Sequence, residues 1–430
     1  MDNHPSSAPA VRRRASCRRA ALALGAAFAL TAGAAACSTS SGSSGPGASS
    51  GTYTIWDPYP QFDDSSAWVA LLDRCGGSAG VAVKRTAYDT TDLTSKALLA
   101  AQQGVSADVL IVDNPVVSTL ASAGILTDTS ASHLDTSAVE PNLMGAGEYQ
   151  GKTYGLPIGA NTLALYYNKN ILKSAGVDAT SIKDWATLTA ALQKVKVSGK
   201  TGITFSAIGT EEGSFQFEPW FWGAGAGLTS LDSGRAQAAL GLWTGWVKDG
   251  YAPNSVLNDT QTTSWQEFAA GKTAFSENGT WQLANADKAG FPYGIIDIPA
   301  QNGGAAPVPT GGEFVTIPVQ SNTTRYAVSE KLVACLTSAD NAFATDNTLS
   351  YVAASKDVQA KQVAANPELG VWVQAVQSGK ARTGDDLGTN YPKISQQLWT
   401  AVQASLSGSA SVSSALSSAQ SAAASATGGK

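Results

Sequence analysis

Two short clusters combine tryptophan with carboxylate or amide side chains, and this combination suits the binding of a polyhydroxylated ligand. They are FEPWFW at residues 217–222 and NGTW at residues 278–281. Aromatic rings stack on apolar C–H faces, whereas carboxylates and amides pair with hydroxyl groups. A buried polar group without a partner costs about 1–3 kcal/mol, so such a site must satisfy nearly every hydroxyl of its ligand.

Other tryptophans of the chain are better explained by packing. Trp68, Trp185, Trp243 and Trp246 fall at helical spacing among apolar residues, and Trp265 is also assigned to structure. Tryptophan alone therefore does not mark the binding site.

Residues for hydrolytic or metal-dependent catalysis are scarce. Once His4 is removed with the N-terminal segment described below, His133 is the only histidine, and its neighbours are polar. A Ser-His-Asp site built on it has little support, and histidine-rich zinc sites are excluded. No pair of acids stands in a recognisable catalytic context, which disfavours a secreted glycosidase. We expect a binding protein without enzymatic activity, cofactor or bound metal.

The first 36 residues have the order of an export signal. Five arginines between Arg12 and Arg19 precede an uncharged Ala/Leu-rich run that is short for a membrane span, which needs about 20 apolar residues. Cys37 follows directly and is similar to the acylated cysteine of bacterial lipoproteins; cleavage nearby without acylation is the alternative. The next residues, to Gly51, are rich in Ser and Gly, which is typical of a flexible tether. We expect a signal peptide at 1–36, a lipidated Cys37 with a tether at 37–51, and anchoring to the outer face of the cell membrane.

The remaining chain is modestly acidic. The full sequence has 28 basic and 33 acidic residues, and removing residues 1–36 takes away five arginines and one aspartate, which leaves a net charge of −9. This balance disfavours nucleic acid and anionic membrane surfaces as partners. Cys75 and Cys335 remain after the N-terminal cysteines are assigned, and outside the cytoplasm they could form a disulfide or stay as two buried thiols.

Strand and helix patterns alternate along the first part of the chain. Residues 52–56, 81–85 and 108–112 predict strands, and helices are expected after each of them, one of them capped by Asp92. Further along the chain we expect a helix ending at Gly250, over residues 242–250, and a final helix at 411–424. This alternation indicates an α/β fold with a mostly parallel sheet. The length suffices for two lobes.

Beyond these patterns, the sequence resembles the type 1 extracellular solute-binding proteins of ABC importers. The resemblance runs over nearly the whole chain after the tether. It is carried by SADVLIVD, AGILTDTS, GKTYGLPIGANTLALYYNKNIL, DWATLTAAL, FQFEPWFWGAGA, FAAGKTAFSENGTWQ, TGGEFVTIP and YPKISQQLW, in the expected order.

The family's fold has two α/β lobes joined by crossing strands, with the ligand in the cleft between them, a type II periplasmic-binding-protein arrangement. The resemblance implies crossings near residues 156–167, 313–319 and Tyr351. The N-terminal lobe would comprise 52–158 and 313–350, and the C-terminal lobe 159–312 and 351–430. On that layout Cys75 and Cys335 belong to one lobe, which favours the disulfide.

The resemblance also implies ligand-binding roles. In maltose-binding members of the family, a Glu-Pro-aromatic motif lines the sugar site, which implies Glu218 as hydroxyl acceptor and Trp220 as stacking platform. Trp222 either shares that role or packs under it. An aromatic residue after Asn-Gly stacks on the sugar, which implies Trp281, with Asn278 as a hydrogen-bonding partner. Asn161 stands where those members have an acidic residue, and this departure argues against maltose itself.

Further candidates come from strand ends, glycines and the C-terminal part. Ligands in open α/β sheets bind beyond the carboxyl ends of strands, and paired glycines let the backbone approach a cleft closely. These candidates are Trp56, Asp57, Asp113, Asn114, Gly311, Gly312, Glu313, Arg382 and Trp399.

The function implied is capture of a sugar, such as an oligosaccharide, by lobe closure and its delivery to the permease of an ABC importer. We expect the protein to act as a monomer. The alternatives are the same fold with another polar cargo, such as a polyamine, thiamine or a metal chelate, and the disfavoured glycosidase.

Overall fold

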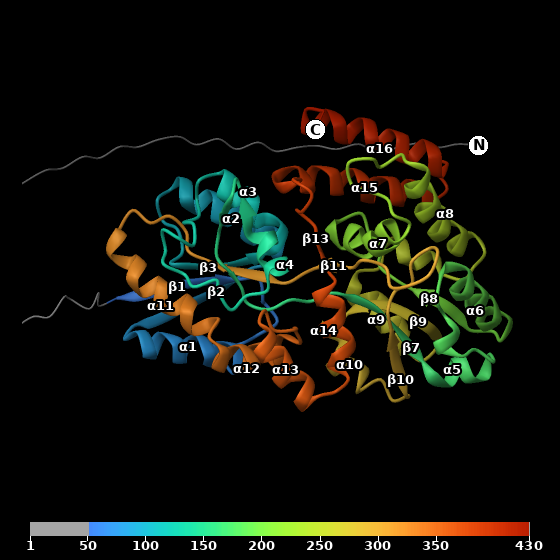
Figure 1. Cartoon of the computed structure of the whole chain (residues 1–430), viewed down its shortest axis with the longest axis horizontal. Helices are drawn as coiled ribbons and strands as arrows, with labels where there is room; N and C mark the ends of the chain where they lie inside the picture. Colours follow the sequence, from blue (N-terminus) through green and yellow to red (C-terminus); the bar gives the residue numbers. More distant parts are fainter. Residues whose placement is uncertain (1–50, 430) are drawn as a thin grey trace, which may run out of the picture. The chain divides into compact units, whose positions relative to one another are not determined.

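The computed structural model describes residues 51–429 (Figure 1). The predicted signal peptide, Cys37 and all of the tether except Gly51 lie outside these residues. Within residues 51–429, none of the helices is both long and apolar enough to cross a membrane.

The first lobe is built on a five-stranded sheet with the order β2-β1-β3-β12-β6. Its apolar strands form because alternating or continuous hydrophobic runs, such as VLIV in β3, are buried against helices. The strands are β1 (Thr52–Asp57), β2 (Ala82–Ala87), β3 (Val109–Asp113), β6 (Leu156–Pro157) and β12 (Glu313–Thr316). The hairpin of β4 (Glu148–Tyr149) and β5 (Lys152–Thr153) extends this lobe.

Helices from two distant parts of the chain complete the first lobe, whose core includes Trp68, Val112 and Leu332. They are α1 (Ala67–Ala79), α2 (Thr90–Gln102), α3 (Val117–Ser122), α4 (Pro141–Met144), α11 (Tyr326–Leu336) and α12 (Ala339–Leu349). α1 packs against both α11 and α12.

The second lobe is built on a four-stranded sheet with the order β10-β7-β9-β8. The strands are β7 (Leu163–Asn168), β8 (Thr201–Thr204), β9 (Thr273–Gly279) and β10 (Tyr293–Ile296). A separate ladder pairs β11 (Pro309–Thr310) with β13 (Lys380–Ala381).

A large aromatic core lies beneath this sheet and includes Trp220, Trp243 and Trp246, all at most 1% exposed. The helices of this lobe are α5 (Lys169–Ser174), α6 (Trp185–Val197), α7 (Glu211–Gly223), α8 (Gly234–Lys248), α9 (Gln261–Ala269), α10 (Leu283–Ala286), α13 (Lys356–Ala365), α14 (Leu369–Gln377), α15 (Tyr391–Leu406) and α16 (Val412–Thr427). The last two run side by side (Figure 1).

Three chain segments pass between the sheets and contact one another. The first connects β6 to β7, the second connects β11 to β12, and the third lies near Tyr351. Single bridges join Ala160 to Val352 and Asn161 to Gly311, so the first segment pairs with both others. These bridges fix the backbone between the lobes.

The sheets are mixed, whereas the sequence predicts mostly parallel pairing. β1 pairs in parallel with β2 and β3, but β12 runs antiparallel to β3 and β6, and β7 runs antiparallel to β9 and β10. The register pairs Glu313, where β12 begins, with Asp113, where β3 ends. The returning strand therefore enters the sheet at the carboxyl end of β3 and must run the opposite way.

The predicted helices occur, but their ends differ. The helix predicted at 242–250 is the second half of α8, which begins at Gly234 and ends at Lys248. α2 begins at Thr90 after the cap position Asp89, so Asp92 lies in the first turn and is not the cap. An acidic residue in a first turn is favoured by the helix dipole, which gives a similar sequence pattern. The final helix begins after Ser411 as expected, and the Ser411 hydroxyl accepts a hydrogen bond from the Ser414 N–H.

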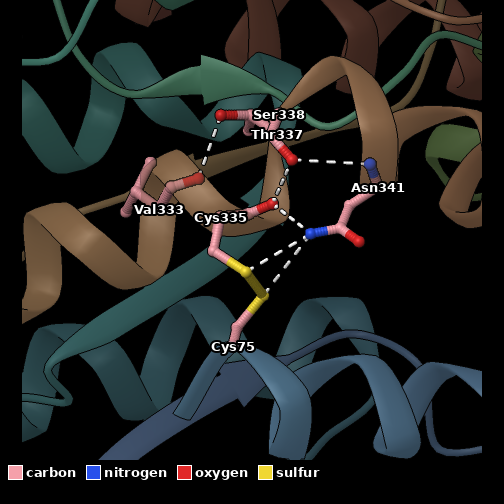
Figure 2. The surroundings of a disulfide bond; sticks show 6 residues. All are labelled: Cys75, Val333, Cys335, Thr337, Ser338 and Asn341. Carbon is pink, nitrogen blue, oxygen red and sulfur yellow. Dashed lines mark hydrogen bonds between the residues drawn. A yellow bond between two sulfur atoms is a disulfide. The ribbon is translucent and has the colours of Figure 1, made fainter. Parts of the chain in front are cut away.

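A disulfide joins Cys75 of α1 to Cys335 of α11, with Cα atoms 5.7 Å apart (Figure 2). The Asn341 side-chain amide reaches the Cys335 carbonyl at 2.9 Å and lies 3.3 Å from the Cys335 sulfur. Both cysteines lie in the core of the first lobe or against it. The bond therefore ties together the two chain segments that build this lobe.

Candidate ligand-binding cleft

A cavity of about 410 Å³ lies where the two lobes meet the crossing segments. A second cavity of about 300 Å³ adjoins it, because Glu212, Gln261, Trp281 and Glu313 border both. Together they form the interlobe cleft. A separate cavity of about 540 Å³ lies between the β4–β5 hairpin and residues 381–390, and none of the predicted binding residues lines it.

Two glycines allow the crossing segments to line the cleft. Gly312 has φ +105°, and a Cβ there would lie 2.6 Å from the Gly159 carbonyl oxygen. A Cβ on Gly311 would lie 2.0 Å from Oδ1 of Asn161. Asn161, Gly311 and Gly312 all line the cavity. The backbones can approach this closely only without side chains at 311 and 312.

Glu313 follows these glycines and is held by two tyrosines. The hydroxyls of Tyr59 and Tyr351 donate to its Oε2 at 2.8 and 2.7 Å. Burial, and next the nearby negative charge of Asp113, raise the pKa of the Glu313 carboxyl to about 7, although the tyrosine hydrogen bonds favour its charged form. Its Oε1 accepts no hydrogen bond from any residue in the range 51–429.

Arg382 joins groups from both lobes at the other side of the cavity. Its guanidinium donates to Glu211 Oε1 at 2.9 Å, Asp113 Oδ1 at 2.9 Å and Asn114 Oδ1 at 3.0 Å. It also lies over the Phe215 ring, 4.9 Å from the centroid. The side chain is 3% exposed, and its Nε has no acceptor among the described residues.

Trp281 supplies the aromatic surface shared by the two parts of the cleft. It lies on the 3₁₀ turn Thr280–Gln282 directly after β9, and it is half-buried. Its ring folds back over Gly279, where a Cβ would lie 2.0 Å from a ring carbon. The ring centroid lies 6.3 Å from that of Phe215. The glycine at 279 is thus needed for the position of the ring.

Comparison of the sequence with known protein families identifies one family whose members bind solutes, in agreement with a cleft between two α/β lobes. The family of bacterial extracellular solute-binding proteins matches residues 70–371. The chain belongs to this family. Its members bind solutes and are not enzymes, so the predicted family and the predicted lack of enzymatic activity are both confirmed.

Relatives of this solute-binding protein include two that are named for glucose oligomers. A maltodextrin-binding protein of Bacillus subtilis is 28% identical over 220 residues, which are 49% of this chain and 51% of the relative. A maltooligosaccharide ABC transporter solute-binding lipoprotein of Streptococcus pneumoniae is 26% identical over 248 residues, 55% of each chain. A binding protein of Brucella abortus is 30% identical over 165 residues, 36% of this chain and 40% of the relative. The chain thus spans about half the length of these relatives or less.

Solved structures match over most of the chain and confirm the two-lobed α/β fold. The GacH receptor of Streptomyces glaucescens, solved unliganded and with acarbose, is 25% identical, with a TM-score of 0.75 over 87% of this chain and 98% of the other. UgpB of Mycobacterium tuberculosis, solved with glycerophosphocholine, has a TM-score of 0.76 at 22% identity over 87% and 97% of the two chains, and shows the fold alone.

The solute-binding protein brings seven of the predicted residues to the cleft. They come from the end of β3, the first two crossing segments, the turn after β9 and the residue after β13. They are Asp113, Asn161, Trp281, Gly311, Gly312, Glu313 and Arg382.

The FEPWFW cluster does not line the cleft, which corrects the predicted placement of three residues. Glu218, Trp220 and Trp222 lie on α7 and are 0%, 0% and 5% exposed within the core of the second lobe. Trp220 Nε1 donates to Glu277 Oε2 at 2.8 Å, and Glu218 accepts a hydrogen bond from Tyr391. α7 is buried along nearly its whole length, from Gly213 to Trp222, so its tryptophans pack in the core, and Phe215 is the aromatic residue of this helix that lines the cleft.

Three candidates at strand ends are occupied by other contacts. Asp57 is 0% exposed and is bonded by Arg85, Trp68 and a backbone amide. Trp56 lies over a separate small cavity and stacks edge-on with Tyr88. Asn114 is 3% exposed and links Arg382 to the Thr310 carbonyl, so it supports the crossing without lining the cavity.

Asn278 and Trp399 also lie away from the cleft. Asn278 is 0% exposed, and its amide donates to the Gln261 carbonyl at 2.9 Å, so it positions a cleft residue without facing the cavity. Trp399 is a half-buried residue of α15 and borders neither part of the cleft. Asn278 therefore has a supporting role and not the predicted contact.

Several cleft residues were not predicted from the sequence. Those that line the larger cavity are Thr90, Thr210, Glu211, Glu212, Phe215 and Gln261. Four of them lie at the N-terminal end of α7 or just before it, and Gln261 begins α9. The acidic pair 211–212 at a helix start is the one signal available, but it equally suits an ordinary first turn.

Proposed function

We propose that this chain is the extracytoplasmic binding lipoprotein of an ABC importer and captures a sugar, such as an oligosaccharide, for the permease. One observation carries this proposal: the cleft combines the half-buried face of Trp281 with several carboxylates beside the crossing segments. Aromatic faces and hydrogen-bond acceptors are what a hydroxylated ring requires. The names of the Bacillus and Streptococcus relatives support the same class of cargo.

The anchor and the lobe boundaries belong to the proposal as well. An acylated Cys37 followed by a Ser/Gly tether would hold the folded part at the membrane, and the Streptococcus relative is named as a lipoprotein. We assign residues 52–158 and 313–350 to one lobe and 159–312 and 351–430 to the other. A ligand that contacts both lobes favours the closed arrangement by its higher affinity for it, and the crossings act as the hinge.

The test is a thermal-shift screen of the purified protein against mono- and oligosaccharides, polyamines and thiamine. A ligand at about 100 times its dissociation constant adds roughly 2.7 kcal/mol to stability, which raises the melting temperature visibly. We expect a shift with one sugar class that is lost in Trp281→Ala and retained in Trp56→Ala, whose ring lies outside the cleft. A response confined to polyamines or thiamine would overturn the assignment of a sugar.

A further inference from the structure

The charges that border the cleft do not balance. Asp113, Glu211, Glu212 and Glu313 are acidic, and among the described residues that line its two parts Arg382 is the single basic residue. Arg382 is already paired with Asp113 and Glu211, each at 2.9 Å. Glu212 and Glu313 have no cationic partner within residues 51–429.

The two unpaired carboxylates lie where the parts of the cleft join, and each keeps an oxygen available. Glu212 Oε2 accepts the Gln261 backbone N–H at 2.9 Å, and no described residue donates to its Oε1. Both tyrosine hydrogen bonds to Glu313 fall on Oε2. Trp281 borders the same two cavities, so an indole face accompanies the free oxygens.

Two charged side chains beside the cleft, Arg382 and Glu313, lie in buried surroundings that satisfy them only in part. The Arg382 Nε–H is buried on a side chain that is 3% exposed and has no acceptor in the described chain. Burial, and next the charge of Asp113, raise the pKa of Glu313 to about 7, and the two tyrosine hydrogen bonds and the charge of Arg382 offset these effects only in part.

We propose that the captured sugar carries a protonated amine, which binds between Glu212, Glu313 and the face of Trp281. This inference rests on the proposed capture of a sugar and narrows its class to amino sugars or sugars joined through an amine. An ammonium group donates several hydrogen bonds, interacts with an indole face and supplies the missing positive charge. A neutral hydroxyl group supplies only the hydrogen bond.

The position of the two carboxylates also gives the amine a role in closure. Glu212 lies at the start of α7 in the second lobe, and Glu313 begins β12 of the first. Without a cation, drawing the lobes together brings like charges closer. A cation that contacts both carboxylates turns this repulsion into attraction, so it favours the closed arrangement over the open one.

The experiment is calorimetric titration with sugars that differ in charge but share one backbone. β-1,4-linked oligomers of glucose, glucosamine and N-acetylglucosamine differ only in the group at C2. A malto-oligosaccharide and its counterpart with a nitrogen in place of one glycosidic oxygen form an α-linked pair. We expect the amine-bearing member of one set to bind at least tenfold more tightly than its neutral partners. Its affinity should fall as salt rises, whereas that of a neutral partner should not.

Substitution of Glu212 and of Glu313 tests whether these carboxylates cause the preference for the amine-bearing sugar. Glu212→Gln and Glu313→Gln should each reduce the preference for the amine at least threefold, and Glu148→Gln, an exposed residue outside the cleft, should leave it unchanged. Thermal melts of each variant show that it is folded. Neutral members that bind as tightly as the amine would overturn this inference and leave the proposed capture of a sugar intact. A protein that binds no sugar but responds to another solute overturns both.

Discussion

At the scale of single residues, the surroundings of each acid decide its role. Glu218 and Glu313 are both predicted ligand-binding residues, yet Glu218 lies in the core of the second lobe and Glu313 borders the cleft. Burial raises the pKa of Glu218 and of Glu277 well above the usual value, because both lie in an apolar core. These two acids hold their neighbours in place, whereas Glu313 keeps a free oxygen toward the cavity.

Glu313 gives a prediction for the dependence of stability on pH. Its pKa is about 7 in the folded protein against 4.5 for a free side chain, so the folded state binds the proton more tightly. The contribution to stability is therefore full below pH 4.5 and is lost as pH rises to about 7. Glu313→Gln imitates the neutral form and should be more stable than the wild type by about 1–3 kcal/mol at pH 8, with no difference at pH 4.5.

Urea unfolding at a series of pH values measures this difference. Glu148→Gln, at an exposed position, serves as the control and should show the same small difference at every pH. If the difference in unfolding free energy between Glu313→Gln and the wild type is constant between pH 4.5 and pH 8, ionisation of Glu313 does not destabilise the folded protein.

Trp220 gives a second residue-scale prediction, because it distinguishes packing from binding. Trp220→Phe removes the Nε1–H donor from Glu277, whose other oxygen already has no partner. A buried acceptor left without its hydrogen bond costs about 1–3 kcal/mol. We expect this loss of unfolding free energy without a change in ligand affinity, and the reverse for Trp281→Ala. If Trp220→Phe keeps full stability but binds the ligand more weakly, Trp220 is a ligand-binding residue.

At the scale of secondary structure, local sequence patterns predicted individual strands and helices better than the way in which distant strands pair. The strand 108–112 and the helix after Ser411 are recognisable because burial and capping leave marks in adjacent residues. The antiparallel course of β12 is not, because it depends on where a distant segment re-enters the sheet. The site divides in the same way. Glycines 311 and 312 and Trp281 have local signals, whereas Glu212 and Gln261 reach the cleft only through the packing of α7 and α9.

Two glycine substitutions test whether the crossing segments tolerate a side chain, because Gly312 is crowded and Gly241 has open space around it. Gly312→Ala places a Cβ 2.6 Å from the Gly159 carbonyl oxygen at a φ of +105°, which should cost at least about 1–3 kcal/mol and weaken ligand binding. Gly241→Ala lies at an exposed position of α8 with open space around it, and it should stabilise by roughly 0.5–1 kcal/mol. Urea unfolding of both variants measures these changes. Equal effects from the two substitutions would mean that the crossing tolerates a side chain.

At the scale of the molecule, the chain builds most of the first lobe, crosses, builds much of the second lobe, and returns. The sheet of the first lobe therefore depends on β12, whose sequence lies far from that of β1 and β3. The disulfide fixes this long-range arrangement by joining α1 to α11 across 260 residues. Most of the second lobe lies inside the loop that the bond closes.

Closure of so long a loop should make the disulfide a large contribution to stability. A bond that closes a loop of 100 residues or more removes chain entropy worth about 4–5 kcal/mol from the unfolded state. The double variant Cys75→Ala, Cys335→Ala should lose about this amount and should no longer respond to a reductant, whereas the wild type should lose a similar amount when it is reduced. Urea unfolding with and without reductant measures both. Because neither cysteine lines the cleft, ligand affinity below the unfolding transition should stay the same. A reduced wild type that unfolds at the same urea concentration as the oxidised one would show that packing alone holds the two segments of the first lobe together.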